Sequence, residues 1–344
     1  MIKKRNTIIA SLALLLVFAA SLTFLFLRSV PYGKIESALK AGDPDQAIAL
    51  GDPFLKAGSN DAKLVKLLGE AYVTKAEYSN QRSFLVRKSR MILTHLNNQT
   101  NDLEVQNLLG QGFLVIHQYA LANEIYQKIA LLSPKDAEVW ARLGEASEGL
   151  SKYSEAEKNY KKALTLDPSS DGAVLGMIRT DIRAARFDEV VKLANAQLAK
   201  TSNILTKALI HENLAIVAER KSDIKGATKE FKLALSLNPN LPTSLSLYSL
   251  ILLKEIPSNI SVKDMWAKTK DPLALAIKAR SISSAYPYAL AALSDIYALR
   301  NDRVAAQKFA MAVRRALPQS NLLLAEKKAL SEKYKAPVPS RSKK

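Results

Sequence analysis

A pattern of large and small residues recurs every 34 positions, and it constrains the fold of this 344-residue chain more than any other feature. Residues 137–170 carry it as Trp140, Leu143, Gly144, Ala156, Tyr160, Ala163 and Pro168. Residues 103–136 carry it as Leu109, Gly110, Ala122, Tyr126 and Pro134, and residues 208–241, about three residues later than an exact 34-residue spacing would place them, carry it as Ala227, Phe231, Ala234 and Pro239. Agreement at a fixed period predicts a repeating structural unit.

Each unit is predicted to be a pair of amphipathic helices. Residues 138–150 and 154–167 show helical periodicity and flank a short turn. The small residues Gly144 and Ala156 let neighbouring helices approach to about 8–10 Å. Pro168 disfavours helix at the residue before it and ends the second helix. One pair cannot bury its own apolar face, so the units must stack on one another.

The units resemble the tetratricopeptide repeat (TPR), although Ser147 replaces a usual large residue in 137–170. The resemblance covers about residues 28–335 and implies an all-α solenoid, a right-handed superhelix with a concave groove lined by the first helix of each pair. We therefore expect an array of seven to eight repeats over 28–320. It is followed by a capping helix over 321–335 and a basic disordered tail over 336–344.

The N-terminal segment predicts a membrane anchor. Residues 1–6 form a basic flank, and residues 7–27 carry no charge. As a helix this stretch spans about 31 Å, which matches the hydrocarbon core of a bilayer. A cleaved signal peptide is the alternative, but the apolar run exceeds the roughly 7–15 residues of a signal. The basic flank favours a cytoplasmic N-terminus, with the repeats on the far side, in the periplasm of a bacterium or otherwise outside the cytoplasm.

The sequence carries no recognisable catalytic arrangement. Cysteine is absent, which excludes disulfides and thiolate chemistry. The three histidines, His95, His117 and His211, are far apart in the sequence and lie outside any metal-binding motif. Phosphate-binding loops and nucleophile elbows are also missing. We expect a non-enzymatic protein that needs no metal or cofactor.

The resemblance also implies where a partner would bind. In this family, ligand contacts come from fixed positions of each first helix. Here those positions hold Glu104, Asn107, Gln111, Arg142, Glu145, Glu148, Arg179, Arg183, Glu212, Asn213, Glu219 and Arg220. Their mixed charges and amides suit an extended peptide or a partner helix. The Lys and Asn set with which TPR co-chaperones hold a C-terminal carboxylate is missing, since Asn107 stands where Lys is needed.

Charge adds a second expected contact. The formal net charge is +18, and much of the excess lies at the two ends of the chain. The basic C-terminal tail suits an anionic surface. Nucleic acid is disfavoured, because aromatic residues do not interleave with the basic ones.

Together these features predict a membrane-tethered TPR scaffold that binds protein or peptide partners in its groove. A bacterial envelope assembly, secretion or polysaccharide-export system is the favoured setting. One alternative is a cytosol-facing membrane receptor or adaptor for polypeptide chains. A less favoured alternative is an envelope enzyme with an unrecognised site.

Overall fold

The computed structural model describes residues 29–335 except 78, 80, 81, 101, 321 and 323. In this part the chain forms 18 α-helices and one short 3₁₀ helix, without strands, which confirms the all-α prediction. The predicted flank 1–6, membrane helix 7–27 and tail 336–344 lie outside the described residues. None of the helices in the described part combines the length and apolar character needed to cross a membrane.

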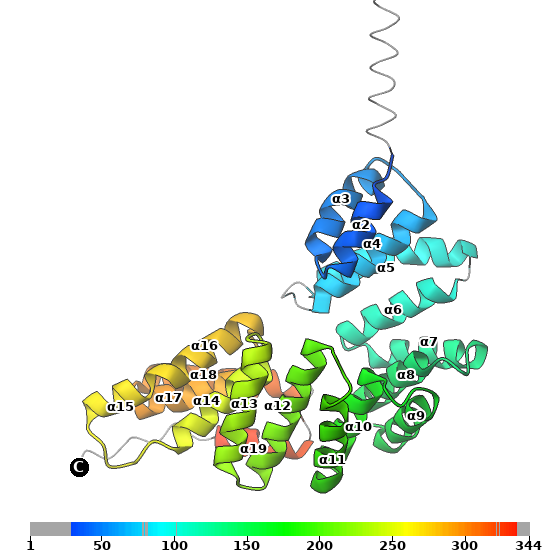
Figure 1. Cartoon of the computed structure of the whole chain (residues 1–344). Helices are drawn as coiled ribbons and strands as arrows, with labels where there is room; N and C mark the ends of the chain where they lie inside the picture. The colour runs from blue at the N-terminus through cyan, green and yellow to red at the C-terminus, as the bar shows by residue number, and fades with distance from the viewer. Residues whose placement is uncertain are drawn as a thin grey trace, which may run out of the picture. The chain divides into compact units, whose positions relative to one another are not determined.

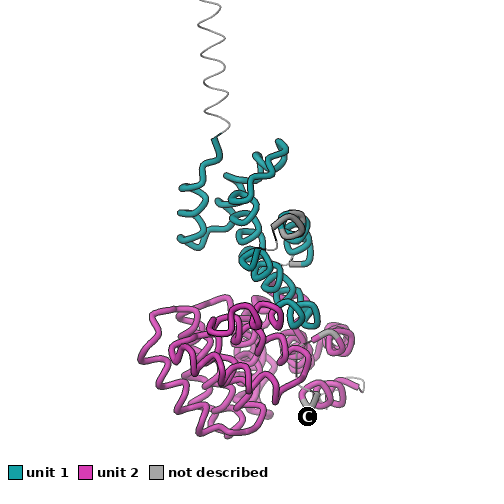
Figure 2. Tube along the Cα trace, turned by 90° about the vertical axis from the view of Figure 1, so that its right-hand side faces the viewer, with its two compact units in different colours: residues 1–125 teal, residues 126–344 magenta. Residues whose placement is uncertain are grey.

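The chain divides into two compact units, residues 1–125 and 126–344 (Figure 2). Unit 1 holds α2 (Tyr32–Lys40), α3 (Pro44–Lys56), α4 (Ala62–Glu77), α5 (Arg82–Thr100), α6 (Leu103–Val115) and the start of α7 (Tyr119–Leu132). Helix α2 packs on α3, and α4 packs on α5. The first helices α2, α4 and α6 also touch in succession, so they form one row.

Unit 2 continues the helix pairs (Figure 1). It contains α8 (Ala137–Gly149), α9 (Tyr153–Leu166), α10 (Asp171–Arg183), α11 (Phe187–Leu198), α12 (Ile204–Arg220), α13 (Ile224–Leu237) and α14 (Pro242–Lys254). It ends with α15 (Val262–Lys268), α16 (Lys270–Ile282), α17 (Pro287–Leu299), α18 (Arg303–Ala316), η1 (Leu317–Gln319) and α19 (Leu324–Lys333). Helices α8, α10 and α12 touch in succession, and α14 touches α17. These contacts build the row of first helices that positions the site.

The small residues of the pattern lie against large rings. Tyr160 is only 1% exposed and Ala156 is fully buried. A Cβ added to Gly144 would come within 2.7 Å of the Tyr160 ring, and one added to Gly176 within 2.2 Å. These glycines are therefore required for close helix packing. As expected from Pro168, the preceding residue is extended, with φ −139°, and α9 ends before it.

The turns inside the helix pairs share one backbone feature. His117, Ser151, Ala185, Ser222 and Asn301 all have positive φ, between 56° and 63°. At the first helix of 137–170, Ser151 N–H donates to Glu148 O and Lys152 N–H donates to Ser147 O, each at 2.9 Å. This arrangement closes a helix C-terminus and usually takes glycine. The left-handed residue of these turns is therefore not marked by glycine, although the short turn of 137–170 is predicted from helical periodicity.

Candidate functional site

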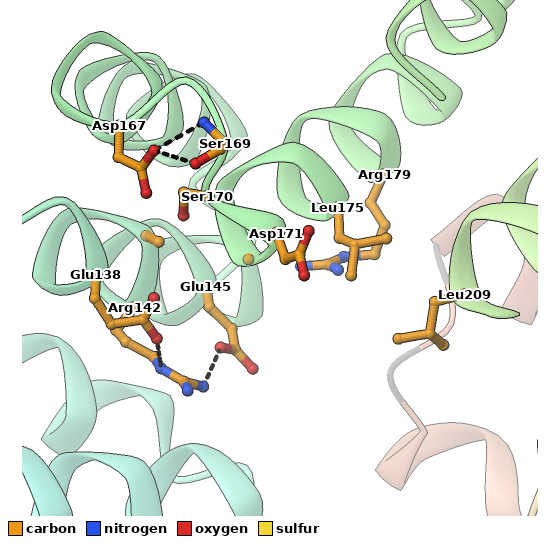
Figure 3. A pocket seen from close by; sticks show the side chains of 12 residues that line it. Glu138, Arg142, Glu145, Asp167, Ser169, Ser170, Asp171, Leu175, Arg179 and Leu209 are labelled. Carbon is orange, nitrogen blue, oxygen red and sulfur yellow. Dashed lines mark hydrogen bonds and ion pairs between the residues drawn. The ribbon is translucent and has the colours of Figure 1, made fainter. Parts of the chain in front are cut away.

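The row of first helices in unit 2 contains a pocket of about 610 Å³ between α8, α10 and α12 (Figure 3). Its lining residues are Glu138, Ala141, Arg142, Glu145, Asp167, Ser169, Ser170, Asp171, Gly172, Leu175, Arg179 and Leu209. Three residues predicted to contact a partner, Arg142, Glu145 and Arg179, are among them. The predicted first-helix positions therefore converge on one opening at this point of unit 2.

Carboxylates outnumber cations in this pocket. Arg142 lies between Glu138, at 2.8 Å from Nε to Oε1, and Glu145, at 3.5 Å from Nη1 to Oε2. Figure 3 shows Glu145 on α8 and Asp171 at the start of α10 directed toward the same space. Asp167 completes the acidic set from the turn between α9 and α10. The pocket thus presents acidic groups in a strongly basic chain.

Local bonds hold the acidic turn in place. Asp167 accepts from the hydroxyl of Ser169 at 2.6 Å and from its N–H at 2.8 Å, and these bonds lower the pKa of the Asp167 carboxyl. Asp171 accepts from Gln197 Nε2 at 2.6 Å and from the hydroxyl of Thr206 at 2.8 Å. The two aspartates are therefore held in place by hydrogen bonds from neighbouring residues.

Glu148 anchors the wall of the pocket from below. It is 9% exposed, yet it accepts from Arg179 Nη2 at 2.9 Å, Arg183 Nη2 at 3.1 Å and the hydroxyl of Tyr160 at 2.8 Å. Burial raises the pKa of the Glu148 carboxyl, but the charges and hydrogen bonds of the arginines hold it below its usual value. The ion pairs fix Arg179 at the pocket edge, so Glu148 is a structural group.

Glu212 on α12 is equally buried, at 9% exposed, but it has a different environment. It accepts from the N–H of Ser244 at 3.0 Å and from its hydroxyl at 2.6 Å. Burial raises the pKa of the Glu212 carboxyl, and these hydrogen bonds oppose the rise only in part. Glu212 therefore joins α12 to the start of α14 from within the core.

The remaining predicted groove residues have contacts elsewhere. Asn213 is buried and donates to Leu209 O on its own helix at 2.7 Å. Glu219 bonds Lys254 at 2.8 Å, and Arg220 bonds Glu326 at 3.1 Å. On α6 of unit 1, Glu104 bonds Lys66 at 2.6 Å, while Asn107 and Gln111 are half-buried. Partner binding by these twelve residues remains a prediction, and the burial of Glu148, Glu212 and Asn213 gives those three an internal role.

Sequence reasoning missed part of the pocket. Glu138, Asp167 and Asp171 line it without having been predicted as contacts. A usable signal was present: Asp167 and Asp171 lie on both sides of the turn that joins α9 to α10, close to the start of a first helix. The list of first-helix positions overlooked Asp167 and Asp171 because they flank a turn, and it omitted Glu138, which lies on the first helix α8 itself.

Unit 1 has a smaller pocket, of about 310 Å³, between α3, α4 and α5. Asp52 lines it and bonds Lys88 at 2.9 Å, Lys56 at 3.2 Å and the hydroxyl of Tyr72. Its ionic groups therefore already satisfy one another. Within the described residues, groups of three or more acidic or histidine side chains suited to a metal ion are absent.

Comparison with known proteins agrees with the helix-pair architecture described above. The segment 137–170 matches the family described as tetratricopeptide repeat. These residues are a TPR unit. A curated relative, cellulose synthase operon protein C of Pseudomonas fluorescens (strain SBW25), is 25% identical over 217 residues. The match covers 61% of this chain but only 17% of that much longer protein.

Two solved structures are similar to this chain. The human IFIT1 dimer with m7Gppp-AAAA has a TM-score of 0.56 and 12% identity, and the match covers 87% of this chain and 75% of that one. The pilF protein of Pseudomonas aeruginosa has a TM-score of 0.49 and 17% identity, with 67% of this chain and 97% of that one covered. At such low identity the likeness to IFIT1 supports a TPR-like solenoid and nothing about ligands.

Proposed function

We propose that this chain is a non-enzymatic scaffold that binds a partner polypeptide along the first helices of unit 2. The pocket between α8, α10 and α12 is the observation that carries the proposal. A TPR unit at 137–170 supplies the first of these helices. The partner inserts a lysine or arginine side chain among the carboxylates of Glu145, Asp167 and Asp171.

Charge supports a cationic group on the partner. The two arginines of the pocket are already paired, Arg142 with Glu138 and Glu145, and Arg179 with Glu148. Ser169, at the turn before α10, also lines the pocket, and its hydroxyl oxygen can accept a hydrogen bond from the partner. A flexible basic peptide can use both kinds of contact, and the electrostatic attraction also speeds the encounter.

The envelope setting is part of the proposal. Its support is the uncharged stretch over 7–27 with its basic flank, together with the similarity to cellulose synthase operon protein C. In this setting the N-terminal helix anchors the chain and the repeats lie outside the cytoplasm, where they hold a component of a polysaccharide-export machine. The basic tail over 336–344 contacts an anionic surface.

A charge reversal tests the pocket. Glu138→Lys with Glu145→Lys removes two lining carboxylates, whose side chains are 51% and 41% exposed, and makes the pocket basic. We expect this variant, produced in its native cells, to lose the polypeptides that co-purify with the wild-type chain. Equal recovery of the same polypeptides would refute the binding site.

The control changes the net charge by the same amount elsewhere. Glu155→Lys with Glu189→Lys alters the second helices α9 and α11, whose substituted residues do not line the pocket. Recovery should match the wild type. Circular dichroism of both variants should be unchanged, since all four residues are at least partly exposed.

Topology distinguishes the envelope scaffold from a cytosol-facing receptor. The chain has no cysteine, so Lys344→Cys gives a single reporter. We expect a membrane-impermeant maleimide to label it in cells whose outer barrier has been opened but whose inner membrane is intact. Protection until the inner membrane is lysed would favour the receptor.

A further inference from the structure

Helix α19 contacts the row of first helices far from its place in the sequence. Arg220 at the end of α12 forms an ion pair with Glu326 of α19, with Nη2 and Oε1 3.1 Å apart. The side chains are 30% and 27% exposed, so the pair is partly shielded from solvent. The two residues are separated by more than a hundred positions, and helices α13 to α18 lie between them in the sequence.

The same helix also binds α17. Lys333 Nζ lies 2.7 Å from Asp295 Oδ2, and the Tyr334 hydroxyl donates to Asp295 Oδ1 at 2.9 Å. Burial, together with the carboxylate of Glu326, raises the pKa of Tyr288, whose hydroxyl hydrogen-bonds that carboxylate. Helix α19 therefore bridges α12 and α17, which are first helices of different pairs.

An apolar face of α19 seals this contact. Leu330 is 9% exposed and Tyr334 is 5% exposed, and both pack with Leu290 and Ala291 of α17. Glu326 and Leu330 are four residues apart and share one face of α19, and Tyr334, which directly follows the helix, donates its N–H to Leu330 O at 3.1 Å. The acidic group, the apolar group and the tyrosine that contact α12 and α17 thus follow one another at four-residue spacing.

A cap that only shields the last repeat requires contacts with α17 and α18. The ion pair with Arg220 is an additional contact that such a cap does not need, because α12 lies earlier in the array than α17 and α18. Arg220 is also one of the residues predicted to face a partner. In Figure 3 the pale red C-terminal ribbon passes on the side of the pocket where Leu209 of α12 lies.

We propose that α19 is a displaceable occupant of a docking surface formed by α12 and α17. The partner that replaces it is an amphipathic helix of the same chemistry, with a carboxylate opposite Arg220, a leucine against Leu290 and a hydroxyl or ammonium group opposite Asp295. This surface differs from the acidic pocket, and the inference does not rest on the proposed function.

A peptide with the sequence of residues 322–335, labelled with fluorescein, is the probe. In the full-length chain, Glu326→Arg places a second positive charge beside Arg220. This repulsion should weaken the docking of the chain's own α19. We expect this variant to bind the peptide at least tenfold more tightly than the wild type, measured by fluorescence anisotropy. A peptide that itself carries Glu326→Arg should bind at least tenfold more weakly than the parent peptide.

Glu332→Arg is the matched control. It makes the same change of charge on α19, but Glu332 is exposed and lies away from the face that Glu326 and Leu330 share. Its peptide affinity should equal that of the wild type. Equal peptide binding by the Glu326→Arg and Glu332→Arg chains would overturn the proposal, as would absence of binding to the Glu326→Arg chain.

A cross-link provides an independent check of the resident state. In the cysteine-free chain, Arg220→Cys with Glu326→Cys should be bridged by a short bis-methanethiosulfonate reagent, and Arg220→Cys with Glu332→Cys should not. The bridged chain should not bind the peptide, and a reductant should restore binding. Failure of this cross-link contradicts the docking of α19 and leaves the charge-reversal test of the pocket unaffected.

Discussion

Glu148 and Glu212 are two glutamates with the same exposure, 9%, in neighbouring regions of unit 2, and their environments have opposite consequences. Two arginines and a tyrosine surround Glu148. Among the described residues, only the N–H and hydroxyl of Ser244 bond Glu212. The pKa of Glu148 is lowered and that of Glu212 is raised.

The comparison shows that burial alone does not decide how a carboxylate acts. At Glu148 the ion pairs offset the cost of desolvation, so the charged form belongs to the folded state. At Glu212 burial opposes the charged form more than the Ser244 hydrogen bonds support it, so the pKa of its carboxyl is raised. The first region stabilises the wall of the pocket, while the second links two first helices through a hydrogen-bonded carboxyl.

The largest expected effect is at Glu148. Glu148→Gln leaves Arg179 and Arg183 without their carboxylate and should lower the free energy of unfolding by about 3 kcal/mol at pH 7. Chemical denaturation measures the loss. A change below about 1 kcal/mol would show that the buried ion pairs add little to stability.

Gly176→Ala tests the packing under the same network. The added Cβ would lie 2.2 Å from the ring of Tyr160, whose hydroxyl donates to Glu148. We expect a loss of about 2 kcal/mol by chemical denaturation. Gly172→Ala is the control, since its Cβ meets Ala141 at an ordinary 3.8 Å. That variant should be as stable as the wild type or more so, and equal losses at both glycines would contradict the packing.

Tyr160→Phe removes one hydrogen bond from Glu148 and keeps the ring. A loss of about 1.5 kcal/mol is expected in the same assay, because the bond goes to a buried charge. Tyr153→Phe, at a tyrosine that is 37% exposed, should change stability by less than about 0.5 kcal/mol. Equal effects at the two tyrosines would show that the Tyr160 hydroxyl does not stabilise the protein through Glu148.

The smallest effect is expected at Glu212. Glu212→Gln keeps an oxygen that accepts from Ser244 and removes a charge that burial disfavours, so stability at pH 7 should stay within about 1 kcal/mol of the wild type or rise. A loss as large as that of Glu148→Gln would show that Glu212 depends on its charge.

Acid should separate the two residues further. A lowered pKa means that the contribution of Glu148 is present above its unfolded pKa, about 4.3, and is lost as pH falls through the folded value. A raised pKa means that the contribution of Glu212 is present below the unfolded value and is lost as pH rises through the folded one. The destabilisation by Glu148→Gln should therefore shrink toward pH 3, while Glu212→Gln should become less favourable.

Much of the fold could be predicted, because large and small residues alternate in a pattern that identifies the repeat. Tyr160 and Gly144 specify a close helix contact, and Pro168 marks a helix end. The turns at Ala185 and Ser222 lack the expected glycine, so their backbone geometry left no sequence signal. The short helix α15, between α14 and its partner α16, departs from the two-helix pattern of the repeat.

The site was harder to predict, because the position of a residue on a helix does not show which other residues of the chain it contacts. Arg142 and Glu145 line the pocket, as the first-helix pattern suggested. Glu148 on α8 and Glu212 on α12 also belong to first helices, but cations and hydroxyls from other helices hold them in the interior. Arg220 meets Glu326, a contact between distant segments that no local pattern could indicate.

The most direct test of partner binding at the acidic pocket is a photo-cross-link from within it. Benzoylphenylalanine at Gly172, an exposed position on the pocket wall, should join the chain to a partner polypeptide in cells. The adduct should disappear when Glu138→Lys and Glu145→Lys are added, and the same probe at Glu189 on α11 should not form it. An adduct that survives the charge reversal, or that forms equally from Glu189, would contradict the account.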